Sequence, residues 1–108
     1  MKIEVLKSKI TKIPVTVSLI NNQGFIKMDK ELMDELHIVE DEMVLVINER
    51  TGKNQKLFVE GLDYSDSYYS MMVPNTIAGV NEKVTVISTC TDTVDEINVS
   101  PIKINVEK

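Results

Sequence analysis

Short stretches in which β-branched and other apolar residues alternate with polar residues recur along this chain. Alternation places successive side chains on opposite faces of a strand, so each stretch predicts a strand. These stretches are residues 3–13, 15–19, 25–28, 43–47, 55–60, 68–73, 84–88 and 97–106. The run at residues 43–47 has no polar interruption and predicts a central strand buried on both faces. Many short strands with one or two brief helical insertions indicate a mainly β protein, a small β-barrel.

Prolines and turn-forming residues divide the predicted strands. Pro14 has no N–H for a strand ladder, so the first strand is expected to bend or change partner there. Residues 21–24 accept positive φ and predict a hairpin or a tight corner. Pro74 is expected to open a short turn of helix through Ala78, and Pro101 restricts the last strand to a sheet edge.

One stretch, residues 30–36, has helical spacing. Asp29 precedes it, and its carboxylate can accept hydrogen bonds from the free N–H groups of the first turn. The apolar face is formed by Leu32, Met33 and Leu36. His37 follows and is interpreted as a helix-end residue, where a positive charge suits the helix dipole. The chain shows no internal repeat by its residues.

The length of 108 residues predicts a single domain, residues 1–108, with one modest core. The 17 acidic residues outnumber the 12 basic ones, which argues against a nucleic-acid partner. Lys2, Glu4 and Lys7 interrupt the first apolar stretch, so neither a signal peptide nor a membrane span is expected there, and we expect a cytoplasmic protein. With one cysteine, Cys90, and one histidine, no internal disulfide or zinc site is expected, and Cys90 is interpreted as a small, at least half-buried hydrophobic residue.

Several short motifs fall in a recognisable order. They are Leu6-Lys7-Ser8-Lys9-Ile10, Met28-Asp29, Leu32-Met33, residues 37–42, Val46-Ile47-Asn48, Thr51-Gly52-Lys53 and residues 84–87. In this order they resemble the pyruvoyl-dependent aspartate 1-decarboxylases, a family of the pantothenate pathway. The resemblance implies a double-psi β-barrel with one or two short helices. It also implies a homotetramer with active sites between neighbouring subunits.

The family makes its pyruvoyl cofactor by cutting its own chain between a glycine and a serine, whose hydroxyl is the nucleophile. The corresponding residues here are Gly24 and Phe25, and a phenyl ring cannot attack a carbonyl. The other glycines precede Lys53, Leu62 and Val80, so the chain contains no Gly-Ser, Gly-Thr or Gly-Cys pair. We therefore expect a degenerate cleavage site and no pyruvoyl cofactor.

The family's other functional positions are mostly replaced as well. Its lysine for the substrate carboxylate matches Lys9, the one residue kept and the one substrate-binding residue expected. The family's histidine falls at Thr11, its tyrosines at Asn22 and Phe58, its arginine at Asn54, its threonine at Leu57, its asparagine at Met72 and its Gly-Ala-Ala run at residues 73–75. Loss of both the nucleophile and the arginine favours a natural inactive relative over a one-residue cleavage mutant. The apolar replacements, Phe25, Leu57, Phe58 and Met72, suggest a former pocket that is filled or that takes another ligand.

Two classes of function remain. The preferred hypothesis is a pseudoenzyme, a non-catalytic binding, regulatory or assembly subunit that forms a homotetramer and can take a protein partner or a small ligand. The alternative is an enzyme of the aspartate decarboxylase type that acts on an amino acid by unrecognised chemistry without a pyruvoyl group. Acidic pairs such as Asp34-Glu35 are typical of a solvated face, and no pattern sets a base beside a nucleophile. Apolar residues expected to serve assembly are Tyr64, Tyr68, Tyr69, Met71 and Met72.

Overall fold

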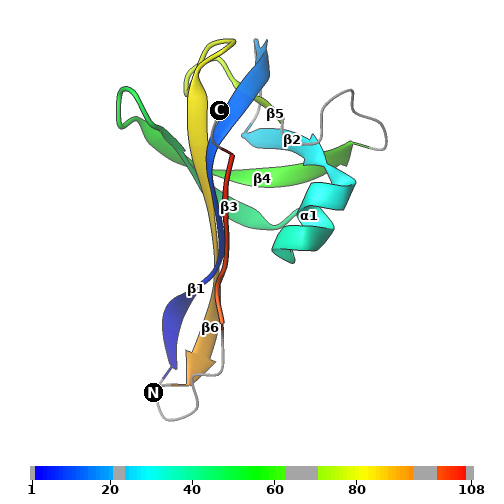
Figure 1. The fold of residues 1–108 in the computed structure, drawn as a ribbon, viewed down its shortest axis with the longest axis vertical. Helices are drawn as coiled ribbons and strands as arrows, with labels where there is room; N and C mark the ends of the chain where they lie inside the picture. The colour runs from blue at the N-terminus through cyan, green and yellow to red at the C-terminus, as the bar shows by residue number, and fades with distance from the viewer. Residues whose placement is uncertain (1, 21–23, 63–70, 94–99, 107–108) are drawn as a thin grey trace.

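A computed structural model describes residues 2–20, 24–62, 71–93 and 100–106. The elements are β1 (Lys2–Leu19), β2 (Phe25–Asp29), α1 (Lys30–Leu36), β3 (Met43–Asn48), β4 (Asn54–Leu62), β5 (Met71–Pro74), β6 (Lys83–Thr93) and β7 (Ile102–Asn105). The predictions for Asn22, for the three tyrosines, and for residues 97 and 99 lie outside these ranges. Figure 1 shows the strands wrapped into a barrel, with α1 beside it.

The strands form one sheet in the order β5-β2-β4-β3-β6-β1-β7, and an additional pairing of β5 with β1 closes the first six strands into a barrel. The pairs β1–β5, β2–β4 and β1–β7 are parallel, and the other pairs are antiparallel. Parts of β1 and β6 continue past the barrel as a ribbon, which gives the molecule extents of 43 × 26 × 25 Å (Figure 1). The prediction of a mainly β barrel with one short helix is confirmed.

Strand β1 changes partner at Pro14, as its sequence predicts. Pro14 is the last residue paired with β6, and from Val15 onward β1 pairs with β5. Strand β7 pairs with the same edge of β1 as β5 does, but closer to the N-terminus of β1, at residues 8–11. Since β7 pairs only with β1 among the described strands, the prediction that the tail forms an edge strand is confirmed. Of the two alternatives for residues 21–24, a hairpin or a tight corner, the hairpin is excluded, because β5 lies between β1 and β2 and these two strands do not pair.

The barrel consists of two halves with the same path: strands β1, β2 and β3 form the first half, and β4, β5 and β6 repeat it in the second. β1 runs parallel to β5, and its counterpart β4 runs parallel to β2. The last strands of the two halves, β3 and β6, are antiparallel neighbours with Val46 opposite Val86. The barrel therefore has approximate twofold symmetry, which we did not expect from the residues alone.

The turns that enter β3 and β6 have the same geometry. Asp41 and Asn81 occupy the same place with φ of 66° and 73°. In each turn the following glutamate accepts a hydrogen bond from the N–H three residues earlier, Val39 to Glu42 at 3.2 Å and Gly79 to Glu82 at 2.8 Å. Asparagine and aspartate tolerate this left-handed backbone better than most residues, so local chemistry fixes both corners.

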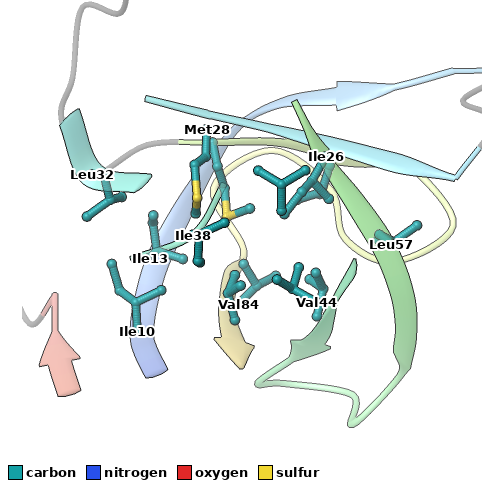
Figure 2. Packing of buried hydrophobic residues seen from close by; sticks show 14 of the residues in the cluster. Ile10, Ile13, Ile26, Met28, Leu32, Ile38, Val44, Leu57 and Val84 are labelled. Carbon is teal, nitrogen blue, oxygen red and sulfur yellow. The ribbon is translucent and has the colours of Figure 1, made fainter. Parts of the chain in front are cut away.

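The core fills the barrel with aliphatic side chains from every strand and from α1. Figure 2 shows Ile10, Ile13, Ile26, Met28 and Leu57 among the side chains that meet there. The prediction that β3 is buried on both faces is wrong, because burial alternates along the strand. Val44 and Val46 are buried, but Met43 is 48% exposed. The side chains on the other face of β3 stay at least partly exposed, so the strand is fully buried on one face only.

Helix α1 begins and ends as predicted. The N–H of Glu31 donates to the Asp29 carboxylate at 2.8 Å, and the apolar face is buried. His37 closes the helix in the left-handed conformation with φ of 57°. The turn expected from Pro74 through Ala78 forms as a single turn, in which the N–H groups of Ile77 and Ala78 both donate to the Pro74 carbonyl oxygen. It does not continue into a second helix.

Candidate functional site

Gly24 and Phe25 lie where the chain enters β2. Gly24 has φ of 97°, in the left-handed region that glycine favours, and open space surrounds the place of a Cβ. Its carbonyl oxygen accepts a hydrogen bond from the N–H of Phe58 at 3.0 Å. The turn and its carbonyl are thus well defined, and the residue that follows is a half-buried phenylalanine.

Large apolar side chains line up across the outer face of the barrel at this point. Phe25 pairs with Phe58 of β4, and Phe58 pairs on its other side with Met43 of β3. Phe58 and Met43 are 47% and 48% exposed. The Lys27 ammonium lies 5.7 Å from the centre of the Phe25 ring, close enough for a cation–π contact. We call Phe25, Phe58 and Met43 the apolar row.

The four apolar replacements expected in one pocket do not share a face. Leu57 is fully buried in the barrel core, whereas its neighbour Phe58 points outward, because successive strand residues face opposite ways. Met72 is half-buried on β5 beside Lys27. Asn54 is exposed at the start of β4, about 13 Å along the strand from Phe58. Within one chain, Phe25, Leu57, Phe58 and Met72 therefore do not line a common pocket.

Lys9 lies apart from Gly24 and Phe25 in the chain's own barrel. Its strand neighbours are Ile87 on β6 and Lys103 on β7. It lines a cavity of about 200 Å³ with Thr11, Lys103, Ile104 and Asn105. One chain thus does not bring Lys9 to Gly24 and Phe25.

A polar cluster ties β1, β6 and the loop before β3 together. The Lys7 ammonium lies 2.8 Å from the Glu42 carboxylate, and the Ser88 hydroxyl donates to the same carboxylate. Burial of Glu42 opposes its ionisation most strongly, but the hydrogen bonds from Lys7, Ser88 and Val39 outweigh burial and lower its pKa below the usual 4.5. Because Glu42 is hydrogen-bonded to Lys7, Ser88 and Val39, this cluster joins β1 and β6 to the loop before β3 and has a structural role.

Asn48 plays a similar part at the other end of β3. It is buried, and its amide donates to the Ile77 carbonyl oxygen at 2.9 Å and to Glu82 at 3.3 Å. Its side-chain oxygen accepts from the N–H groups of Arg50 and Thr51 at 2.9 and 3.3 Å. Glu82 in turn forms an ion pair with Arg50 at 2.5 Å. Hydrogen bonding to the Gly79 N–H, followed by that to Arg50, lowers the pKa of Glu82.

Among the described residues, no group of histidine, cysteine and acidic side chains could hold a metal ion. Within the same residues, no helix has the length and apolar character needed to cross a membrane. Cys90 is a partly buried free thiol, as expected.

Comparison with known proteins decides the family. The family model for aspartate decarboxylase matches residues 1–106. The chain is 33% identical over 99 residues to the aspartate 1-decarboxylase of Clostridium botulinum (strain ATCC 19397 / Type A), covering 91% of this chain and 78% of that protein. It is 35% identical over 97 residues to that of Caldicellulosiruptor saccharolyticus, covering 89% and 76%. The chain belongs to the aspartate decarboxylase family.

The fold comparison agrees with this family. The computationally designed protein msDPBB_sym2, a double-psi β-barrel, superposes with a TM-score of 0.57 at 12% identity, covering 80% of this chain and 96% of that one. The predicted double-psi β-barrel is confirmed. Each of the two parallel pairs, β1–β5 and β2–β4, joins a strand of one symmetric half to a strand of the other.

Gly24 and Phe25, the position expected for cleavage, offer no side-chain nucleophile from which a pyruvoyl group could form. A pyruvoyl group forms from a residue with a hydroxyl or thiol, and the side chain after Gly24 is a hydrocarbon ring. Gly24 thus has the backbone of a turn, and the residue that follows it has no hydroxyl or thiol. Sequence reasoning missed two features: the outward position of Met43, which strict alternation in β3 would have given, and the neighbour of Lys9, which depends on long-range pairing with β7.

Proposed function

We propose that this chain is a non-catalytic member of the aspartate decarboxylase family, a pseudoenzyme that acts as a self-assembling binding or regulatory subunit. The observation that carries the proposal is Phe25 directly after Gly24. Without a hydroxyl or thiol at that position, the chain cannot be cut by acyl shift to give a pyruvoyl end. Its role then depends on what its surface binds.

Assembly is supported by the apolar row. Phe58 and Met43 each leave nearly half of their surface to solvent, and Phe25 adjoins them on the next strand. Contiguous apolar side chains on the wall of a small barrel favour burial against another protein surface. Of the residues first expected to serve assembly, Met71 is only 1% exposed and Met72 is half-buried, and the three tyrosines lie outside the described residues. Because the family is typically oligomeric, a second copy is the first partner to consider, and we propose a homotetramer.

The test is release of carbon dioxide from aspartate, with the Clostridium botulinum enzyme as the positive control. We expect none from this protein, and sustained release would contradict the proposal. The variant Phe25→Ser restores only the hydroxyl, so we expect it to remain mostly uncut and inactive, because self-cleavage also depends on donors that stabilise the developing oxyanion.

Folding of Phe25→Ser should not obscure the result. Because the Phe25 ring is half-buried, its removal costs about 1–2 kcal/mol, less than the roughly 3–5 kcal/mol of a fully buried phenylalanine. The variant Phe25→Ala, which loses the same ring without gaining a hydroxyl, is the matched control. If Phe25→Ser alone matured and decarboxylated aspartate, loss of catalysis would rest on one residue and the proposal of a dedicated binding subunit would fail.

A further inference from the structure

Strands β3 and β6 separate before β6 ends. Their pairing stops at Leu45 and Ile87. Beyond this point β6 continues to Thr93 and, among the described strands, pairs only with β1, as the ribbon that projects from the barrel (Figure 1). The edge of β6 that faces away from β1 is therefore free of any described strand over residues 88–93, and we call it the open edge.

The open edge lacks the features that commonly prevent strand addition. Natural edge strands are protected by lysines, prolines or bulges. Residues 88–93 contain no lysine and no proline, and the extra residue of the nearby bulge, Lys7, belongs to β1. Thr89 and Thr91 are exposed, and threonine favours extended backbone. This edge is thus suited to pairing with another strand.

A cavity of about 200 Å³ lies where β3 and β6 separate. Met43 and Leu45 of β3 and Ile87 of β6 give it apolar walls, and Thr89 lines it beside them. Residues directly opposite each other on paired strands project on the same face. A residue added opposite Thr89 therefore places its side chain on the face that holds the cavity.

Two charged side chains also line the cavity. Glu4 lies on β1 opposite Thr91, and Lys56 lies on β4 opposite Leu45. Both are exposed, and no described residue forms an ion pair or a hydrogen bond with the side chain of either. Because β6 and β3 lie between their strands, the carboxylate and the ammonium approach a bound segment from opposite sides.

The separation of the strands also limits how far an added strand can run. The place opposite Ile87 is occupied by Leu45, so a strand added along the open edge has to end, or turn away, at the residue opposite Thr89. A chain terminus meets this requirement, and the Lys56 ammonium suits a terminal carboxylate. An antiparallel strand brings its C-terminus to this point, since β6 runs from the barrel towards the tip of the ribbon (Figure 1).

We propose that the open edge binds the C-terminal segment of a partner protein by antiparallel strand addition. The last residue of the segment is apolar and fills the cavity, and its carboxylate binds Lys56. A basic side chain two residues earlier lies opposite Thr91 and meets Glu4, which is the direct neighbour of Thr91 on β1. The proposal names a partner class for the binding subunit and rests on that proposed function.

The test is isothermal titration of the full chain with two peptides that differ only at the C-terminus, acetyl-Thr-Lys-Thr-Leu as the free acid and as the amide. The acid should bind with a Kd of about 1 mM or tighter, and the amide about tenfold or more weakly, since it offers Lys56 no charge. Methylation of the backbone nitrogens of the acid should abolish binding, because strand addition depends on main-chain hydrogen bonds. No saturable heat with the acid, or equal affinity for acid and amide, would overturn the proposal.

Three variants locate the site. Lys56→Gln should weaken binding of the acid by about tenfold and leave binding of the amide unchanged. Lys53→Gln makes the same charge change at an exposed position of the same hairpin and is the matched control. Glu4→Gln should weaken binding of the peptide above, but not of its analogue with threonine in place of lysine. Equal weakening by Lys53→Gln and Lys56→Gln would mean a nonspecific charge effect and would refute the site.

A fourth variant separates this partner from a second copy of the chain. Thr91→Lys sets a lysine opposite the peptide lysine, so peptide binding should weaken, while the mass by light scattering should stay that of wild type. A lower mass would mean that a second copy occupies the open edge, and would overturn the proposal. Carbon dioxide release from aspartate is measured separately: an inactive chain that does not bind the acid refutes this site alone, and a decarboxylating chain that binds it refutes only the proposed function.

Discussion

Replacing Asn48 by alanine should be among the most damaging single changes in this barrel. The side chain is 1% exposed and makes four hydrogen bonds that join the β3–β4 turn to the segment before β6. Two of them, to the Ile77 carbonyl oxygen and from the Arg50 N–H, are 2.9 Å long, and the other two are 3.3 Å. Alanine removes all four and leaves the buried Ile77 carbonyl without its partner.

The cost follows from these contacts. A typical hydrogen bond contributes about 1 kcal/mol net, and an unsatisfied buried carbonyl costs about 1–3 kcal/mol. Counting the two shorter bonds in full and the two longer bonds in part gives about 2–4 kcal/mol for Asn48→Ala. For a domain of about 100 residues, 1 kcal/mol corresponds to about 4–8 °C in Tm, so we expect a decrease of roughly 10–30 °C.

The assay is thermal and urea unfolding followed by circular dichroism, with all proteins at one concentration because self-association raises apparent stability. Asn54→Ala is the matched control in the same hairpin: Asn54 is exposed and donates a single 3.2 Å hydrogen bond to the Gly52 carbonyl oxygen. We expect Asn54→Ala to change the free energy of unfolding by less than about 0.5 kcal/mol. If both variants lost the same stability, the reasoning that Asn48 joins two segments of the barrel would be refuted.

Two further predictions follow from the polar cluster and the apolar row. Because the folded state lowers the pKa of Glu42 below 4.5, its ionised form stabilises the protein above about pH 4.5, and this contribution is lost as pH falls through the folded pKa. The stability difference between wild type and Glu42→Gln should therefore be largest near neutral pH and shrink in acid, whereas the exposed control Asp34→Asn should differ little from wild type at either pH. Light scattering should give a mass above the 12.2 kDa of one chain, with four chains expected; Phe58→Glu should lower it, and Val80→Glu, at a side chain 52% exposed outside the row, should not. A wild-type monomer, or dissociation by Val80→Glu alone, would count against assembly through the row.

Features that depend on neighbouring residues in the chain were predictable from the sequence. The cap at Asp29 and the change of partner at Pro14 each follow from one residue's hydrogen-bonding capacity. Features that depend on pairing between distant strands were not. The strand order places β5 between β1 and β2, and it brings Lys103 to Lys9, and no local pattern encodes either.

Two features had a physical cause that the sequence already contained. Leu57 and Phe58 do not share a face of the barrel within one chain, because adjacent residues of a strand face opposite sides. The apolar run of β3 suggested burial on both faces, but the strand is fully buried on one face only. The resemblance to the family indicates which residues fall at its functional positions. The alternation of side chains along each strand then decides which of these residues lie on the same face of the barrel wall.

The most direct test of the central claim is the intact mass of the purified chain under denaturing conditions. We predict one species with the mass of all 108 residues, about 12.2 kDa, because Phe25 offers no nucleophile to the Gly24 carbonyl. Prolonged heating before the measurement should leave this mass unchanged. Two fragments divided after Gly24, with the second beginning at position 25 and carrying a pyruvoyl end, would contradict the account.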